Sequence, residues 1–173
     1  MITLLRRLSA DQKGASAIEF AIVFPLLFLL HVAAAEALQA YIAQRNVAHI
    51  ATAMADITAR NRTVSTAELN DILGASISMM HPFPNVRLQQ RVSSISADSS
   101  GSVATDWTSK KDYTEAEAPS VPTGYLRANE SVIVTDVIYD YEPSFGFFMP
   151  DTIRMTRHAY VRPRLSAKVE KVS

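Results

Sequence analysis

The stretch that decides the fold is residues 17–35, AIEFAIVFPLLFLLHVAAA, an apolar run interrupted by one charged side chain, that of Glu19. Its length of about 19 residues matches the roughly 20 that a helix needs to cross a bilayer. A second glutamate, Glu36, closes the run, and the helical rise places it about 30 Å beyond Ala15, at the far interface. We therefore predict a transmembrane helix over residues 15–36.

The charges before this run predict its orientation. Arg6, Arg7 and Lys13 outnumber the one acidic residue of the segment, Asp11. Basic residues are enriched on the cytoplasmic side of membrane helices. We therefore expect residues 1–14 in the cytoplasm and residues 37–173 outside it.

Glu19 lies at an unfavourable depth for a charge. It follows Ala15 by about 6 Å of helix, inside the near edge of the hydrocarbon. A carboxylate there is costly and is by default a candidate functional residue. There are two alternatives: the Glu19 side chain extends back to the headgroups, or its carboxyl group is protonated.

The sequence around Glu19 carries a family resemblance. Gly14-Ala-Ser-Ala-Ile-Glu19-Phe20 places a glycine directly before a hydrophobic helix whose fifth residue is glutamate. This resembles the processing signal of type IV pilin-like proteins, which a prepilin peptidase cuts after the glycine. Together with Pro25 and Glu36, the segment is similar to the TadE/TadF-like pseudopilins of the Tad (Flp) pilus system.

The resemblance implies a set of expectations about function. It implies cleavage between Gly14 and Ala15, and a role for Glu19 in assembly with neighbouring subunits. The implied partners are the prepilin peptidase, a Flp-type pilin, other minor pseudopilins, the inner-membrane assembly platform and membrane lipid. The implied location is the bacterial inner membrane, with a single pass and a periplasmic C-terminal domain. Whether the protein is of the E or the F type, and whether it enters the filament or stays in a priming complex, remains open.

A secretory signal is the first alternative. Basic residues, an apolar core and Ala33-Ala34-Ala35 also fit a cleavable export signal, which would release a soluble periplasmic protein. The apolar run is long for such a signal, and Glu19 stands where these signals tolerate charge poorly.

The chain beyond Glu36 predicts an α+β domain. Apolar residues recur at helical spacing without Gly or Pro, so the first helix should continue to about Ala59. They are Leu38, Tyr41, Ile42, Ile50, Met54 and Ile57. The capping-box pattern Ser65-x-x-Glu68 begins a second helix, which ends at residues 81–84, HPFP.

The second half predicts a small antiparallel sheet. Alternating residues 86–92 and 103–110 form two strands joined by a turn at residues 98–101, and β-branched residues 131–141 form a central strand. Residues 152–161 form the last strand. We expect residues 145–149, FGFFM, to cap the core, with a partner-binding patch as the alternative. The architecture is thus pilin-like: a long N-terminal membrane helix, a second helix and a sheet. The pattern YDYEP, followed by a final strand and RPR, is also similar to the C-terminal half of TadE-like proteins.

Composition disfavours several functional classes. There is no cysteine, and the 17 basic residues balance the 17 acidic ones. We therefore expect no nucleic-acid binding, no metal site and no cofactor. No nucleophile–base pattern is present, so we expect no enzymatic activity and name no catalytic residue. Asp136 and its acidic neighbours should be solvated. An enzyme on a membrane stalk is the second alternative.

Overall fold

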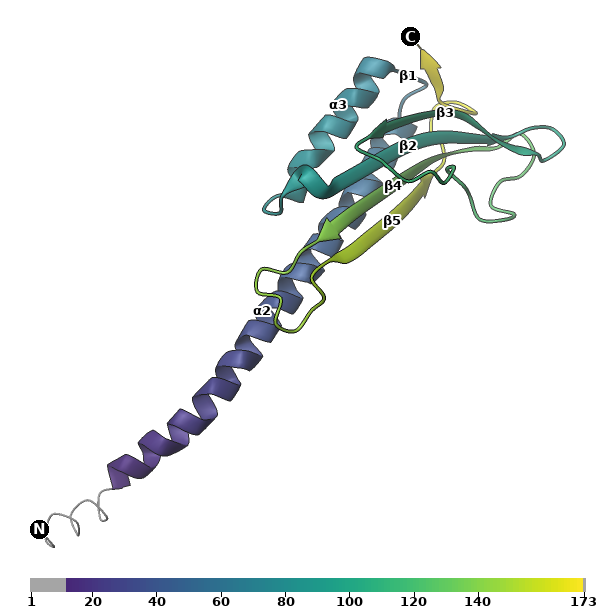
Figure 1. The fold of residues 1–173 in the computed structure, drawn as a ribbon. Helices are drawn as coiled ribbons and strands as arrows, with labels where there is room; N and C mark the ends of the chain where they lie inside the picture. Colours follow the sequence, from purple (N-terminus) through teal and green to yellow (C-terminus); the bar gives the residue numbers. More distant parts are fainter. Residues whose placement is uncertain (1–11, 173) are drawn as a thin grey trace, which may run out of the picture.

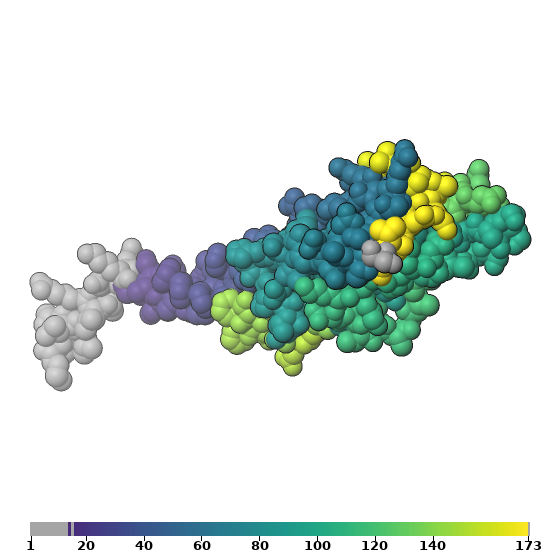
Figure 2. Space-filling model, turned by 90° about the horizontal axis from the view of Figure 1, so that it is seen from above, coloured from purple at the N-terminus to yellow at the C-terminus, as the bar shows by residue number. Residues whose placement is uncertain are grey.

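The computed structural model describes residues 12–172. The elements follow in the order α2 (Gln12–Ala59), β1 (Thr63–Ser65), α3 (Thr66–Ile77), η1 (Ser78–Met80), η2 (Asn85–Arg87), β2 (Leu88–Ala97), β3 (Val103–Lys111), β4 (Ser131–Tyr141), β5 (Ile153–Val161) and β6 (Glu170–Val172). Helix α2 extends from the small domain as a bare stalk at its N-terminal end (Figures 1 and 2). The predicted α+β architecture, with a long apolar helix, a second helix and an antiparallel sheet, is confirmed.

Helix α2 is unbroken over 48 residues, although Pro25 lies inside it. At about 1.5 Å per residue it is about 70 Å long. Its N-terminal half is uncovered, and its C-terminal half packs on the sheet (Figure 1). The predicted continuation of the membrane helix to Ala59 is confirmed.

The face that α2 buries differs from the predicted one. Only Ile50 and Met54 of the predicted apolar residues are buried, while Leu38, Tyr41 and Ile57 are exposed. The buried face consists largely of small residues that let the sheet approach the helix closely: Ala43, Val47, Ala51, Ala55 and Ala59. The Thr135 hydroxyl donates a hydrogen bond of 2.7 Å to the Ala51 carbonyl.

The four-stranded sheet has the order β3-β2-β4-β5, with every neighbouring pair antiparallel. Strand β4 is central, as its β-branched sequence predicts, and nearly all of its residues are buried. One face packs on α2 through Val92, Val137 and Tyr139. The other face carries a smaller apolar cluster around Val132 and Leu126, which belongs to the connection between β3 and β4.

Helix α3 begins as its capping box predicts. The backbone N–H of Glu68 donates to the Ser65 hydroxyl at 3.1 Å, and the backbone N–H of Ser65 donates to the Glu68 carboxylate at 2.7 Å. The helix buries Leu69 and Leu73. It ends at Ile77, where one 3₁₀ turn carries the chain to residues 81–84.

A second, two-stranded sheet was not predicted. Strands β1 and β6 pair in parallel, with Val64 opposite Lys171. Strand β2 also starts at Leu88 rather than at residue 86, because residues 85–87 form a 3₁₀ turn. Trp107 is half-buried against the core and donates a hydrogen bond of 2.8 Å to the Val169 carbonyl.

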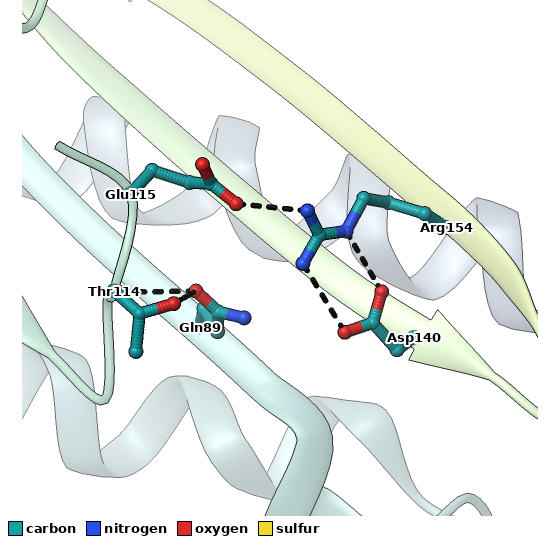
Figure 3. Close-up of polar contacts among 5 residues, drawn as sticks. All are labelled: Gln89, Thr114, Glu115, Asp140 and Arg154. Atoms are coloured by element: carbon teal, nitrogen blue, oxygen red, sulfur yellow. Dashed lines mark hydrogen bonds and ion pairs between the residues drawn. The ribbon is translucent and has the colours of Figure 1, made fainter. Parts of the chain in front are cut away.

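The connection from residue 112 to residue 130 contains no regular element, yet side chains fix it to the sheet. Figure 3 shows that Arg154 of β5 bridges Asp140 of β4, at 2.9 Å, and Glu115 of the connection, at 2.8 Å. Next to this bridge, Thr114 donates to Gln89 of β2 through both its backbone N–H and its hydroxyl. The connection is therefore held at its start by polar contacts to strands β2 and β5.

Candidate functional site on the N-terminal helix

The uncovered half of α2 exposes a dense run of large apolar side chains. Ser16–Ala59 is long and apolar enough to cross a membrane, and its most apolar window of 18 residues has no buried member. Its large side chains are about half to two-thirds exposed: Ile18, Phe20, Ile22, Val23, Phe24, Leu26, Leu27, Phe28, Leu29 and Leu30. Phe20, Phe24 and Phe28 stack along one side, with ring centroids 5.4 and 6.0 Å apart. This helix fits a single-pass membrane protein.

Gly14 and Glu19 lie on this uncovered segment. Glu19 is exposed, and no hydrogen bond or ion pair joins it to another of the described residues. Gly14 is exposed as well, and a Cβ atom built there would meet nothing within 4 Å. Ala15 continues the helix backbone between them. Packing within the chain therefore does not explain why a glycine stands at position 14 or a carboxylate at position 19.

Glu36 is the first buried residue along the described part of α2. Its side chain is fully buried, although the sequence places it at a membrane interface. One carboxylate oxygen, Oε1, accepts hydrogen bonds from the backbone N–H groups of Phe145, at 3.1 Å, and Gly146, at 2.6 Å. These residues belong to the connection between β4 and β5, residues 142–152, which we call the aromatic loop. Glu36 therefore joins the aromatic loop to α2.

A second contact reinforces this junction. The Ser144 hydroxyl donates to the side-chain oxygen of Gln39, one turn along the helix, at 2.9 Å. Below the loop, the Tyr141 hydroxyl and Oε2 of Glu36 are buried without a partner among the described residues. Burial, and then the nearby Glu36 charge, raises the pKa of Tyr141. A buried carboxylate with two amide donors and no cation is unusual enough to need an explanation.

The aromatic loop does not cap the core, so that prediction was wrong. Phe145 is 57% exposed, Phe147 73% and Phe148 54%. The physical reason is that α2 and Tyr141 already close this end of the core, which leaves the three rings outside it. The alternative, a partner-binding patch, agrees with this exposure.

A second polar cluster lies inside the sheet. Asp136 of β4 is buried and accepts from Arg91 of β2 at 2.6–2.7 Å and from Nδ1 of His158 of β5 at 2.6 Å. Arg91 also lies over the Tyr113 ring, 4.4 Å from its centroid. The expectation that Asp136 is solvated was wrong, because the strand register places Arg91 and His158 directly beside it. Asp140, Glu142 and Asp151 keep partly or largely exposed side chains.

The described residues hold no group of three or more side chains suited to bind a metal. A cavity of about 560 Å³ lies between the two sheets, lined by polar residues that include Arg62, Glu130 and Lys168. Glu130 already pairs with Arg162 at 2.8 Å. This cavity contains no histidine and therefore no pair of a histidine base with a nucleophile.

Comparison with known proteins gave one match. Residues 14–56 match the family model described as TadE-like protein. The matched residues begin at Gly14 and include Glu19, Pro25 and Glu36, which are the positions that carried the resemblance in the sequence. The looser C-terminal resemblance lies outside the match and stays a prediction. No significant match was found among curated proteins or among solved structures. The chain therefore carries a TadE-like segment at residues 14–56, which relates it to the Tad pilus system.

Proposed function

We propose that this protein is a minor, pseudopilin-like component of Tad/Flp pilus assembly or of a related secretion apparatus. It is anchored in the bacterial inner membrane by α2 and acts by packing against other subunits rather than by catalysis. The observation that carries the proposal is the uncovered apolar half of α2, which coincides with the TadE-like match. A helical segment that is uncovered within its own chain is suited to bury itself among lipids and neighbouring helices.

The proposed topology places the N-terminus in the cytoplasm and residues 37–173 in the periplasm. Its support is the basic excess of residues 1–14, which precede the apolar segment. A prepilin peptidase then cuts between Gly14 and Ala15. Glycine lowers helix stability by about 1 kcal/mol relative to alanine, which favours local unwinding at the cut. A Cβ atom built at Gly14 meets none of the described residues within 4 Å, so no packing among them opposes this unwinding.

Glu19 is the proposed assembly residue. Cleavage would give Ala15 a free α-amino group, which is largely protonated near pH 7. Glu19 has no partner among the described residues of its own chain, so the amine of a neighbouring subunit is available as its counter-charge. In the membrane such a pair fixes the register of adjacent helices more than it adds stability, because desolvation offsets much of the attraction.

The uncovered side of α2 beyond the membrane supports the same role. Leu38, Tyr41 and Ile57 are 58%, 63% and 48% exposed on the part of the helix that carries the domain. They extend the apolar surface past Glu36 towards the C-terminal end of the helix. Neighbouring pilin-like subunits would cover it by laying their helices alongside.

Two alternatives stay distinguishable from this proposal. A secreted soluble protein would lose residues 1–35 and begin at Glu36. An enzyme on a membrane stalk would need a nucleophile beside a base. His158 and Asp136 form the base half of such a group, but no hydroxyl of the described residues hydrogen-bonds to His158. We therefore propose no enzymatic activity.

N-terminal sequencing and intact mass of the protein from native membranes test the processing step. We expect Ala15 as the first residue, and we expect Gly14→Val to accumulate as an uncleaved, membrane-inserted precursor. Gly14→Ala is the matched control with the smallest side chain, because a Cβ atom at this position meets none of the described residues within 4 Å. A mature protein that begins at Glu36 contradicts the proposal and supports secretion.

Pilus counts and crosslinking to pilus partners test Glu19. Glu19→Ala should leave insertion, cleavage and the domain fold intact but abolish assembly. Glu19→Gln should be nearly as severe because it keeps the shape and removes the charge, whereas Glu19→Asp should retain part of the function. Wild-type assembly in Glu19→Ala would show that this carboxylate has no role between subunits.

A further inference from the structure

We infer that the aromatic loop inserts into the interfacial layer of the membrane and so holds the domain at a fixed height above the bilayer. The inference rests on the membrane anchoring in the proposed function, but not on the pilus role. Its occupant is lipid: the acyl-chain and headgroup boundary on the side of the membrane that faces the domain. The steps below concern height, chemistry and the attachment of the loop.

The first step is the height of the loop along α2. Ser16 begins the apolar span, and Glu36 lies about 30 Å further along the helix at about 1.5 Å per residue. This distance equals the thickness of the hydrocarbon core of a bilayer, about 30 Å. The aromatic loop is joined to α2 at Glu36 (Figure 1). If Ser16 lies at one boundary of the hydrocarbon core, Glu36 and the aromatic loop therefore lie at the opposite boundary.

The second step is the chemistry of the loop. Residues 143–150, PSFGFFMP, contain no charged side chain, and three of the eight are phenylalanines that expose more than half of their surface. Aromatic side chains are enriched at membrane–water interfaces, and phenylalanine anchors interfacial segments through its apolar ring. Tyr41 is 63% exposed about one turn above this level and lines a groove together with Met149 of the loop.

The third step is the attachment of the loop backbone. Polar backbone groups that enter an apolar layer need partners within the protein. The N–H groups of Phe145 and Gly146 have such a partner in Glu36. Gly146 adopts a φ of +67°, a conformation that favours glycine. The side-chain hydroxyl of Ser144 also has a partner within the protein, the side-chain oxygen of Gln39. This arrangement explains why the chain buries a carboxylate without a cation at the point where the helix leaves the domain.

The continuity of the exposed apolar surface from α2 to the loop favours lipid over a second subunit as the partner of the loop. The exposed rings of the loop follow directly on the exposed apolar side chains of α2, from Ile18 to Leu30, at the same end of the domain. A membrane that surrounds the helix therefore meets the loop without any further rearrangement. A neighbouring subunit would have to present a complementary apolar surface at this one height.

Single spin labels on the full chain test the inference, because the chain contains no cysteine that would react elsewhere. Phe147→Cys reports on the loop, and Leu27→Cys reports on the apolar half of α2. Leu165→Cys is the matched control, since Leu165 is 57% exposed and its neighbour Arg164 hydrogen-bonds to Ala59 at the far end of α2. Each labelled protein is placed in vesicles of phosphatidylethanolamine and phosphatidylglycerol. Collisions of the label with oxygen, which partitions into lipid, are then compared with collisions with a water-soluble nickel chelate.

We expect the oxygen-to-nickel collision ratio to fall in the order 27, 147, 165, with the label at 147 shielded from nickel relative to 165. Adding Glu36→Ala should release the loop and shift the ratio at 147 towards that at 165. Gln44 is an exposed helix residue that makes no hydrogen bond to the loop, so Gln44→Ala should leave the ratio at 147 unchanged.

Three other outcomes overturn the inference in different ways. A ratio at 147 as low as at 165, with 27 in lipid, refutes the loop insertion and leaves the membrane anchor standing. A label at 147 that neither reagent reaches shows that protein covers the loop. A label at 27 that nickel reaches freely refutes the membrane anchor itself, and the inference with it.

Discussion

Removal of the Asp136 carboxylate should destabilise the domain far more than removal of the Asp140 carboxylate four residues along the same strand. Both aspartates belong to β4 and both pair with an arginine of a neighbouring strand. They differ in burial. The side chains of Arg91 and Asp136 are 8% and 3% exposed, whereas those of Arg154 and Asp140 are 52% and 28% exposed.

The magnitudes follow from this difference. Asp136→Ala leaves the Arg91 guanidinium buried with only the Glu117 carbonyl and the Tyr113 ring as partners. Breaking a buried ion pair from one side typically costs about 3–5 kcal/mol. Asp140→Ala removes an exposed pair, which is worth about 0.2–1 kcal/mol. The expected gap between the two variants is therefore about 2–5 kcal/mol of unfolding free energy.

Urea unfolding of the full chain in detergent micelles measures this gap. The single tryptophan, Trp107, is a suitable probe because it is half-buried on β3 and hydrogen-bonded to the Val169 carbonyl. Unfolding of the domain breaks that contact and shifts its emission. The Arg91→Met, Asp136→Leu double variant should recover much of the loss, because it leaves no buried charge unpaired.

One result would refute the reasoning. If Asp136→Ala and Asp140→Ala lose the same free energy, the buried pair does not hold β2 to β4, and water must reach Arg91 in the folded protein. An equal loss of unfolding free energy in Asp136→Ala and in the double variant would also contradict the unpaired-charge explanation. In that case packing around residue 136, rather than an unpaired charge, would explain the effect.

Three further predictions concern local contacts. Ser65→Ala should lower the unfolding free energy by about 1 kcal/mol in thermal melts, because α3 loses its N-cap. Hydrogen bonds from the backbone and the hydroxyl of Ser65 lower the pKa of Glu68. The stabilisation from Glu68 is therefore present above its ordinary pKa of 4.5 and is lost as the pH falls through the lowered value. When the pH is lowered, the melting temperature of Glu68→Gln should therefore fall less than that of the unsubstituted protein. Glu36→Ala should accelerate amide exchange at Phe145 and Gly146 but not in β4, as mass spectrometry can resolve.

The parts of the fold that the sequence predicts are those fixed by local rules. The apolar run defines the first half of α2, the Ser65–Glu68 capping box defines the start of α3, and β-branched residues define β4 as central. Each signal lies within one element and needs no knowledge of its neighbours. Strands β1 and β6 have three residues each, which is too short for any alternation pattern to appear.

The parts that the sequence does not predict depend on how distant segments meet. Asp136 becomes a buried ion-pair residue because it stands opposite Arg91 in one neighbouring strand and His158 in the other. A shift of one residue in either register would separate these groups. Glu36 meets the aromatic loop across 109 residues of chain, so its partners cannot be inferred from its surroundings in the sequence.

The two glutamates of α2 illustrate what the chain supplies for itself and what it leaves to others. Glu36 is fully buried and has two backbone donors within the protein. Glu19 lies about 25 Å earlier along the helix, is exposed, and has no donor among the described residues. In water an exposed glutamate needs no explanation, but in a bilayer the same carboxylate is costly until it finds a partner. If α2 crosses the membrane with Glu19 ionised, lipid headgroups and another subunit are the two sources of counter-charge outside the described residues, and the effect of Glu19→Gln on assembly distinguishes them.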